Sequence, residues 1–122
     1  MYNAIIRRVD TVPEMMGGEV AIIQEVVNRL TSQLPVEQIY LFGSRARGDA
    51  KEDSDYDFLV VMDSRLSSGK RVMEVRKAGR VQGYPMDFIV RTPEEMEHGF
   101  ILKKSILLEG KLLFERKRTE MA

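Results

Sequence analysis

Hydrophobic and polar residues in the first part of the chain follow two different periods. In residues 19–34 the apolar positions recur at helical spacing, which predicts a helix with one apolar stripe. The stripe consists of Ile22, Ile23, Val26, Val27 and Leu30. Pro35 ends this helix, and residues 36–42 are dense in apolar and aromatic side chains, which predicts a short strand buried on both sides. The pattern therefore predicts a core-packing helix that leads into a buried strand.

The middle of the chain alternates loops, strands and one amphipathic segment. Residues 44–54 are rich in turn-forming residues and are expected to form at most a short helical turn followed by a loop. Residues 55–62 begin polar and become apolar, and residues 85–90 carry one acid among apolar neighbours, so each segment predicts a strand. Between these strands, residues 70–82 predict a helix. This helix is expected to turn Val72, Val75 and Val81 inward and Lys70, Arg71, Arg76, Lys77 and Arg80 outward.

The last part of the chain completes a small α/β (α+β) fold. Pro93 is expected to open a short helical turn, residues 100–108 predict an apolar helix that Gly110 ends, and residues 111–115 predict an edge strand. The stripe of Phe100, Ile101, Ile106, Leu107 and Leu108 is expected in the core, although its width leaves open a protein–protein contact. We expect a mixed sheet of about four strands with helices packed mainly on one face.

Length and composition predict one domain with a core at about residues 19–114. An arm or short helix is expected before it at residues 1–16, and a frayed tail after it at residues 116–122. The 19 basic and 19 acidic residues cancel, so the charge gives no strong sign of nucleic-acid binding. There is no cysteine, and no apolar run approaches the roughly 18 residues of a membrane span. We therefore expect a cytoplasmic protein without a membrane contact.

The candidate chemistry lies in the segment that runs from residue 43 to residue 57, with the sequence GSRARGDAKEDSDYD. Gly43 allows a ligand to approach the backbone closely, and the turn's N–H groups can face a polyphosphate together with the Ser44 hydroxyl. Asp55 and Asp57 are two residues apart, so on a strand their carboxylates project from the same face. Two adjacent acids repel each other unless a cation lies between them. The segment therefore predicts a site for a nucleoside triphosphate with Mg2+.

A third acid, Asp87, extends this site if its strand lies beside the second strand. Two Mg2+ ions about 3.5–4 Å apart can hold the attacking and leaving oxygens of a nucleotidyl transfer, with carboxylates as ligands. Asp55 and Asp57 are expected to bridge both ions, and Asp87 to complete the ion nearest the acceptor and help remove the acceptor's proton. Arg45 and Arg47 are candidates for binding the leaving pyrophosphate.

These residues carry a family resemblance. The segments GSRARG and SDYDFLV, with the later MDFIV, resemble the DNA polymerase beta-type nucleotidyltransferase superfamily, whose pattern is glycine–serine, ten residues, then aspartate–x–aspartate. Over residues 19–114 the small size is similar to that of the minimal nucleotidyltransferases, or MNT proteins. The resemblance implies ATP as substrate, Mg2+ as cofactor, and a HEPN-domain toxin as partner. Such antitoxins transfer AMP onto a tyrosine of that toxin.

Plainer interpretations stay open beside this one. Asp55 and Asp57 also suit a solvated strand end, and Asp87 can simply reach solvent, although an acid among apolar neighbours is costly if it is buried and unpaired. Arg45 and Arg47 can instead pair with surface carboxylates such as Asp49, Glu52 or Asp53. At the level of function, the chain can be a module that neutralises its partner by binding alone, or an enzyme that modifies a small molecule such as an aminoglycoside.

Overall fold

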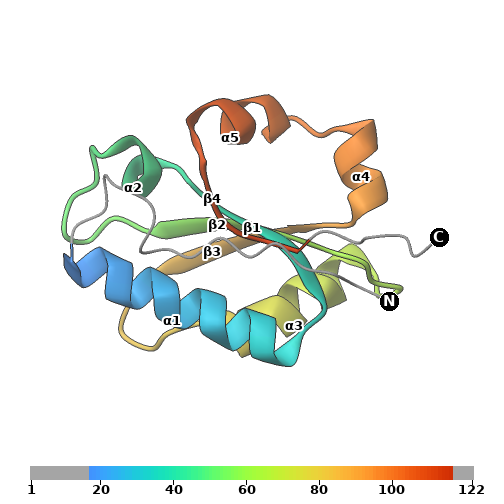
Figure 1. Ribbon diagram of the computed structural model, residues 1–122, viewed down its shortest axis with the longest axis horizontal. Coiled ribbons are helices and arrows are strands. Elements are labelled where there is room, and N and C mark those ends of the chain that lie inside the picture. Colours follow the sequence, from blue (N-terminus) through green and yellow to red (C-terminus); the bar gives the residue numbers. More distant parts are fainter. Residues whose placement is uncertain (1–16, 117–122) are drawn as a thin grey trace.

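The computed structural model describes residues 17–116, which fold into a four-stranded sheet with helices on both faces (Figure 1). The elements in chain order are α1 (Gly17–Gln33), β1 (Val36–Phe42), α2 (Ser44–Arg47), β2 (Tyr56–Met62), α3 (Ser68–Gly79), β3 (Met86–Arg91), α4 (Pro93–His98), α5 (Lys103–Glu109) and β4 (Lys111–Glu115). The predicted arm and most of the predicted tail lie outside the described residues. Arg116 is described, and its N–H donates to the Glu37 carbonyl at 2.8 Å.

The sheet has the strand order β3-β2-β1-β4, which confirms the predicted mixed sheet of four strands. β1 pairs antiparallel with β2 and with β4, whereas β2 and β3 pair in parallel. Parallel neighbours need a crossover connection, and α3 supplies it between β2 and β3. The second and third predicted strands are therefore neighbours, as the site requires.

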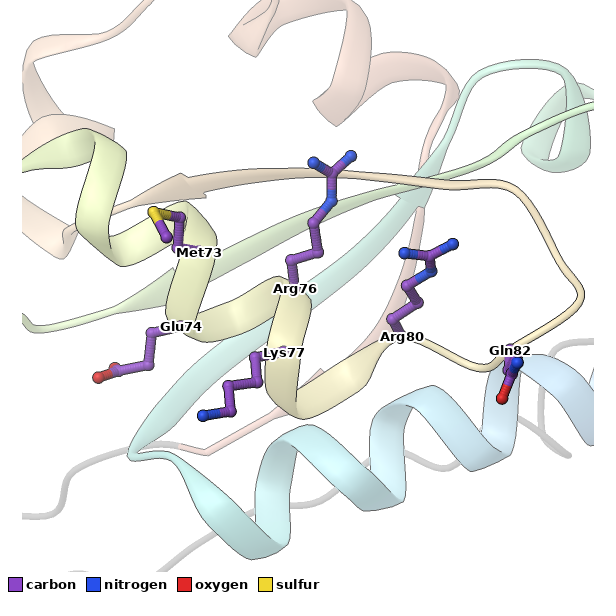
Figure 2. Close-up of a pocket in the computed structure, with 6 residues that line it drawn as sticks. All are labelled: Met73, Glu74, Arg76, Lys77, Arg80 and Gln82. Atoms are coloured by element: carbon purple, nitrogen blue, oxygen red, sulfur yellow. The ribbon is translucent and has the colours of Figure 1, made fainter.

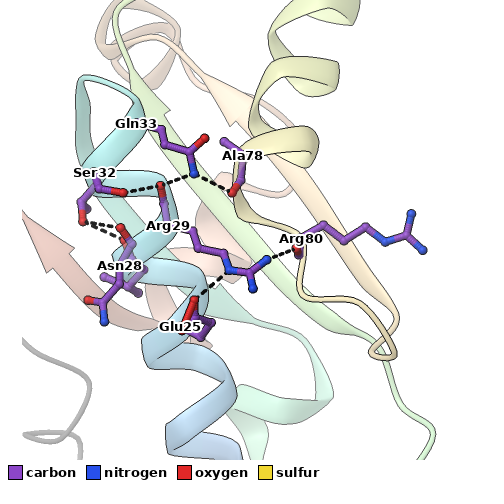
Figure 3. A network of polar contacts seen from close by, with 9 residues as sticks. Glu25, Asn28, Arg29, Ser32, Gln33, Ala78 and Arg80 are labelled. Atoms are coloured by element: carbon purple, nitrogen blue, oxygen red, sulfur yellow. Dashed lines mark hydrogen bonds and ion pairs between the residues drawn. The ribbon is translucent and has the colours of Figure 1, made fainter.

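The main core lies between the sheet and the two long helices, α1 and α3 (Figure 1). Ile23, Val26 and Leu30 of the predicted stripe are fully buried there. Gly79, at the end of α3, allows the two helices to approach, because a Cβ at this position would lie 2.8 Å from Leu30 Cδ2. At the same end, Arg29 and Gln33 of α1 donate to the carbonyls of Arg80 and Ala78 at 2.8 and 3.2 Å (Figure 3). Hydrogen bonds from α1 side chains to backbone carbonyls thus fix the C-terminal end of α3 against α1.

The short helices α4 and α5 lie over the opposite face of the sheet, so the prediction of helices mainly on one face holds for the long helices (Figure 1). Leu59, Val61 and Ile106 form a second buried cluster there, with Phe100 packed against it. β2 is consequently buried on both of its faces. No described helix is long and apolar enough to cross a membrane.

The expectation that the apolar stripe of residues 100–108 lies in the core is wrong for Ile101, Leu107 and Leu108, which are exposed. α5 begins at Lys103 rather than at residue 100, and only Ile106 of the run is fully buried. Ile101 is 99% exposed and Leu108 is 75% exposed. Ile101 lies before the first residue of α5, and within α5 successive residues point about 100° apart, so Ile106, Leu107 and Leu108 cannot all face the sheet.

The prediction that Arg71 faces solvent is also wrong, because its residue is 5% exposed. Its guanidinium donates to both carboxylate oxygens of Glu95, at 2.7 and 3.1 Å. Glu95 also closes a capping box with Thr92, which begins the helical turn predicted at Pro93. The Arg71 hydrogen bonds, followed by the Thr92 N–H, lower the pKa of Glu95 to about 2. A charged, bidentate pair therefore joins α3 to α4, which is what allows the arginine to be buried.

The remaining predicted elements agree with the structure to within a few residues. α3 begins at Ser68 and ends at Gly79, earlier than the predicted span of residues 70–82, and Val75 is fully buried on its inner face. β2 begins at Tyr56, so Asp55 lies just before the strand rather than in it. β3 extends to Arg91. These shifts leave the candidate residues at the same end of the sheet.

Candidate active site

The turn between β1 and α2 brings its backbone directly against a carboxylate of β2. Gly43 has φ 74° and ψ −157°, a conformation open almost only to glycine. A Cβ at this position would lie 2.3 Å from Asp57 Oδ2. The Gly43 carbonyl accepts from the Ala46 and Arg47 N–H groups at 3.1 and 3.0 Å, which starts the short helix α2. The missing side chain of Gly43 therefore makes room for the Asp57 carboxylate beside the turn, with Ser44 as the next residue.

Three carboxylates converge at the end of β2 and β3. In the parallel register Asp57 is the partner of Asp87, so both side chains project from the same face of the sheet. Asp55 joins them from the residue before β2, and carboxylate oxygens of the three residues all lie within 4.8 Å of one another. Asp57 is half-buried, whereas Asp55 and Asp87 are exposed. The structure thus brings together the three acids that the sequence singled out.

The environment of Asp57 disfavours its negative charge. Burial, followed by the charges of Asp87 and Asp55, raises the pKa of Asp57 to about 6, although Arg47 opposes this rise. An acid that repels two neighbours is stabilised most directly by a cation held among the three. The donor set of carboxylate oxygens suits a hard divalent ion such as Mg2+. The residues present therefore fit the expected cofactor.

Arg45 connects the elements that surround the site. Its guanidinium pairs with Glu19 of α1 at 2.7 Å and donates to the backbone carbonyls of Glu52 and Ser54 at 3.1 and 3.0 Å. It also lies over the Tyr56 ring, 4.2 Å from the centroid, and its side chain is only 10% exposed. These contacts join α1, the loop before β2 and β2 itself. A role in binding phosphate stays a prediction for this residue.

Arg47 is better placed than Arg45 to reach a ligand. Its side chain is 45% exposed, and its pairs with Asp49 and Glu109 are long, at 3.4 and 3.8 Å. It is also the cation that acts on the pKa of Asp57. The expected pairing with Asp49 is present, yet weak surface pairs of this kind exchange easily for a more highly charged ligand.

Arg76 is a residue of the site that sequence reasoning assigned only to the outer face of a helix. Its Nη2 lies 3.9 Å from Asp87 Oδ1. Helical spacing correctly predicts that Arg76 is exposed, but it does not tell which neighbouring element the side chain faces. Only the packing of α3 against β3 brings the arginine to the acids.

Comparisons with known proteins identify the family and the fold of the chain. A family model described as "Nucleotidyltransferase domain" matches residues 23–113. Over 43 residues the chain is 51% identical to a protein of Methanocaldococcus jannaschii described as a candidate protein adenylyltransferase. That segment is 34% of this chain and 43% of the relative, so the match spans less than half of the relative's length.

Solved structures share the fold. A candidate nucleotidyltransferase from Sulfolobus solfataricus has a TM-score of 0.56 and 28% identity, over 75% of this chain and 76% of that one. A toxin–antitoxin structure with AMP-PNP has a TM-score of 0.50 and 19% identity, over 81% of this chain and 74% of that one. A mutant of the toxin–antitoxin pair MntA–HpeT also has a TM-score of 0.50 and 19% identity, over 80% of this chain and 73% of that one. At 19% identity these last two show the fold alone.

The fold and the acid cluster define an α/β domain of the nucleotide-transferring class. Because the family model covers most of the chain, the protein belongs to the nucleotidyltransferase domain family. The resemblance seen in the sequence is confirmed at this level. The roles of the individual site residues stay predictions.

Proposed function

We propose that this chain is a Mg2+-dependent adenylyltransferase that transfers AMP from ATP to a tyrosine hydroxyl of a HEPN-domain toxin, and so acts as its antitoxin. The observation that carries the catalytic part is the convergence of Asp55, Asp57 and Asp87 within 4.8 Å beside the Gly43 turn. The M. jannaschii relative supports a protein acceptor. The tyrosine and the HEPN partner come from the resemblance to MNT proteins.

The three carboxylates would hold two Mg2+ ions together with phosphate oxygens of ATP. When bound, the ions neutralise charge that develops on the transferring phosphoryl group and on the leaving oxygen. The carboxylates are already in place for this task, since β2 and β3 fix the relative positions of Asp57 and Asp87. A preformed ligand set needs little rearrangement when the ions bind.

The side chains around the acids have separate roles in the transfer. Asp87 takes the proton of the acceptor hydroxyl as the hydroxyl oxygen forms its bond to the α-phosphorus. The bond between that phosphorus and the oxygen leading to the β-phosphorus breaks, and pyrophosphate leaves. Ser44 and the N–H groups of its turn bind the β- and γ-phosphates, and Arg47 stabilises the charge on pyrophosphate. Arg45 connects the elements around the site, and it reaches phosphate only if it leaves Glu19 and the backbone carbonyls that it now binds.

Labelled ATP tests this proposal directly. The full chain is incubated with Mg2+ and the HEPN protein encoded beside it, using ATP labelled either at the α-phosphate or at the γ-phosphate. Transfer of AMP labels the acceptor only from α-labelled ATP. Asp57→Asn should abolish the label, whereas Asp63→Asn, at an exposed position just beyond the other end of β2, should retain it. Label from the γ-phosphate, or none while ATP binds, would contradict the proposal.

A second function, neutralisation by binding alone, is favoured by one observation. Ile101 and Leu108 are 99% and 75% exposed, and a partner could cover such side chains. Under this alternative Asp57→Asn still neutralises the toxin in cells, and Leu108→Ser does not. Under the catalytic proposal Asp57→Asn fails to neutralise it. Growth of cells that express the toxin with each variant separates the two.

A further inference from the structure

An open groove runs along the outer side of α3, next to the acid cluster. It has a volume of about 930 Å³. Its lining consists of Met73, Glu74, Arg76, Lys77, Arg80 and Gln82. Figure 2 shows Arg76 and Arg80 extending in one direction from the helix region, with Lys77 and Glu74 extending in another. Three of the six lining residues, Arg76, Lys77 and Arg80, are therefore basic, and Met73 adds an exposed apolar side chain.

A series of contacts connects this groove to the nucleotide end of the site. The Gly43 turn lies against Asp57, Asp57 is the register partner of Asp87, and Asp87 lies 3.9 Å from Arg76. The strand order places β1, which leads into the turn, on one side of β2 and the edge strand β3 on the other, and the Arg76 side chain of α3 reaches Asp87 at that edge. If the triphosphate occupies the turn, the edge at β3 is left open for the acceptor. The groove begins on that side, at Arg76.

The groove's cations are available for a ligand. Among residues 17–116, neither Lys77 nor Arg80 forms an ion pair with a carboxylate. Arg76 has only its long contact with Asp87, and a metal ion on Asp87 would repel the guanidinium and release it. Met73 adds an apolar surface that is 71% exposed. Unpaired positive charge next to an apolar side chain suits a polypeptide that carries acidic and apolar residues.

The same observations disfavour a nucleic-acid backbone. Glu74 places a carboxylate among the three basic residues of the lining, so the positive surface is interrupted. The chain as a whole has no excess of positive charge, with 19 basic and 19 acidic residues. A track for phosphates needs a continuous basic surface, which this groove does not provide.

We propose that the α3 groove binds an acidic segment next to the hydroxyl that accepts AMP, and thereby selects the acceptor protein. This proposal rests on the proposed function, because it assigns the acceptor side of the same site. The groove is held in shape without a ligand: Arg29 of α1 binds the Arg80 carbonyl at 2.8 Å, while the Arg80 side chain extends away from α1 (Figure 3). Arg80 can therefore bind a partner without disturbing the contact between the two helices.

Peptide binding tests the groove independently of transfer. The probes are two fluorescein-labelled peptides with a central tyrosine, one flanked by glutamates and a leucine, the other by lysines and a leucine. Anisotropy with the full chain, Mg2+ and a non-hydrolysable ATP analogue gives each affinity. We expect the acidic peptide to bind more tightly, and the Lys77→Glu/Arg80→Glu variant to weaken it about tenfold by exchanging attraction for repulsion. Lys70→Glu makes the same kind of change at an exposed position of α3 outside the groove and should have little effect.

Three results would overturn the proposal. The first is equal binding of both peptides, or binding of neither. The second is a loss of affinity in Lys70→Glu as large as that in the Lys77→Glu/Arg80→Glu variant. The third is tighter binding of a single-stranded oligonucleotide than of the acidic peptide. Transfer is then measured on the same peptides with α-labelled ATP. If the acidic peptide binds more tightly but receives no label, the proposal for the groove stands and the proposed transfer is contradicted. If both peptides are labelled to the same extent, the proposed transfer stands and selection of the acceptor by the groove is contradicted.

Discussion

Replacing Asp57 by asparagine should stabilise the metal-free protein while destroying its activity. The substitution keeps the shape of the side chain and removes a negative charge that burial and two neighbouring acids disfavour. The pKa of Asp57 rises from 3.8 to about 6. At about 1.4 kcal/mol per unit, that rise sets an upper limit of about 3 kcal/mol on the stability that ionised Asp57 costs at neutral pH, and solvent screening at this half-buried site reduces the cost to about 2–3 kcal/mol.

The dependence on pH has a definite sign. Because the pKa of Asp57 is higher in the folded protein than in the unfolded chain, the penalty is absent below about pH 3.8 and complete above about pH 6. The stability gained by Asp57→Asn should therefore be largest at pH 7.5 and fall by about half at pH 5. At pH 7.5 a gain of this size corresponds to a rise in Tm of roughly 10 °C.

Thermal unfolding followed by circular dichroism measures this effect, in EDTA and again with Mg2+. Mg2+ should stabilise the natural chain and have little effect on Asp57→Asn, because the variant has lost a ligand and most of the repulsion that the ion relieves. Asp63→Asn is the matched control, since it neutralises an exposed aspartate and should change stability by no more than about 0.5 kcal/mol. If Asp57→Asn in EDTA is no more stable than this control at pH 7.5, the carboxylates do not repel each other as argued.

Two further substitutions test the supporting contacts. Gly43→Ala and Gly48→Ala both put a side chain where φ is positive, but only the side chain at residue 43 meets a neighbour, Asp57. The loss in thermal stability or in Mg2+ affinity should therefore be at least twice as large for Gly43→Ala as for Gly48→Ala. Equal losses would contradict the packing of the turn against Asp57. Glu95→Gln should reduce the free energy of unfolding, measured by denaturant titration, by about 2 kcal/mol at pH 7. The reduction should become smaller as the pH falls from about 4.5 towards 2, because Glu95 itself becomes protonated in that range. Glu94→Gln is the control, because its side chain is 82% exposed and the substitution should change the free energy of unfolding little.

The part of the site that could be predicted from the sequence is the part set by local spacing and by strand pairing. Asp55 and Asp57 are close in the chain, so any strand-like conformation keeps their carboxylates near each other. Asp87 required one assumption, that its strand lies next to β2, and the α3 crossover makes those strands parallel neighbours. Gly43 was predicted as a position of close approach, but the approaching group, Asp57, was identified only by the structure.

What could not be predicted depends on which surfaces meet in the folded protein. Arg71 and Arg76 are both basic residues of α3 that were predicted to face solvent, yet one is buried against Glu95 and the other faces Asp87. Helical periodicity gives the direction of each side chain relative to its own helix, but not the carboxylate that another element places opposite it. Likewise, the apolar run at residues 100–108 predicts a helix without telling that α5 presents only Ile106 to the sheet.

β2 connects the stability of the fold to the geometry of the site. From Phe58 to Met62 its residues are at most 3% exposed, because helices cover both faces of the sheet. A shift of β2 by one residue against β3 would move these apolar side chains to the opposite faces and would also separate Asp57 from Asp87. The apolar half of the strand therefore fixes the register that holds the repelling acids together at its polar end. Metal binding should accordingly depend on the packing of this strand as well as on the three carboxylates.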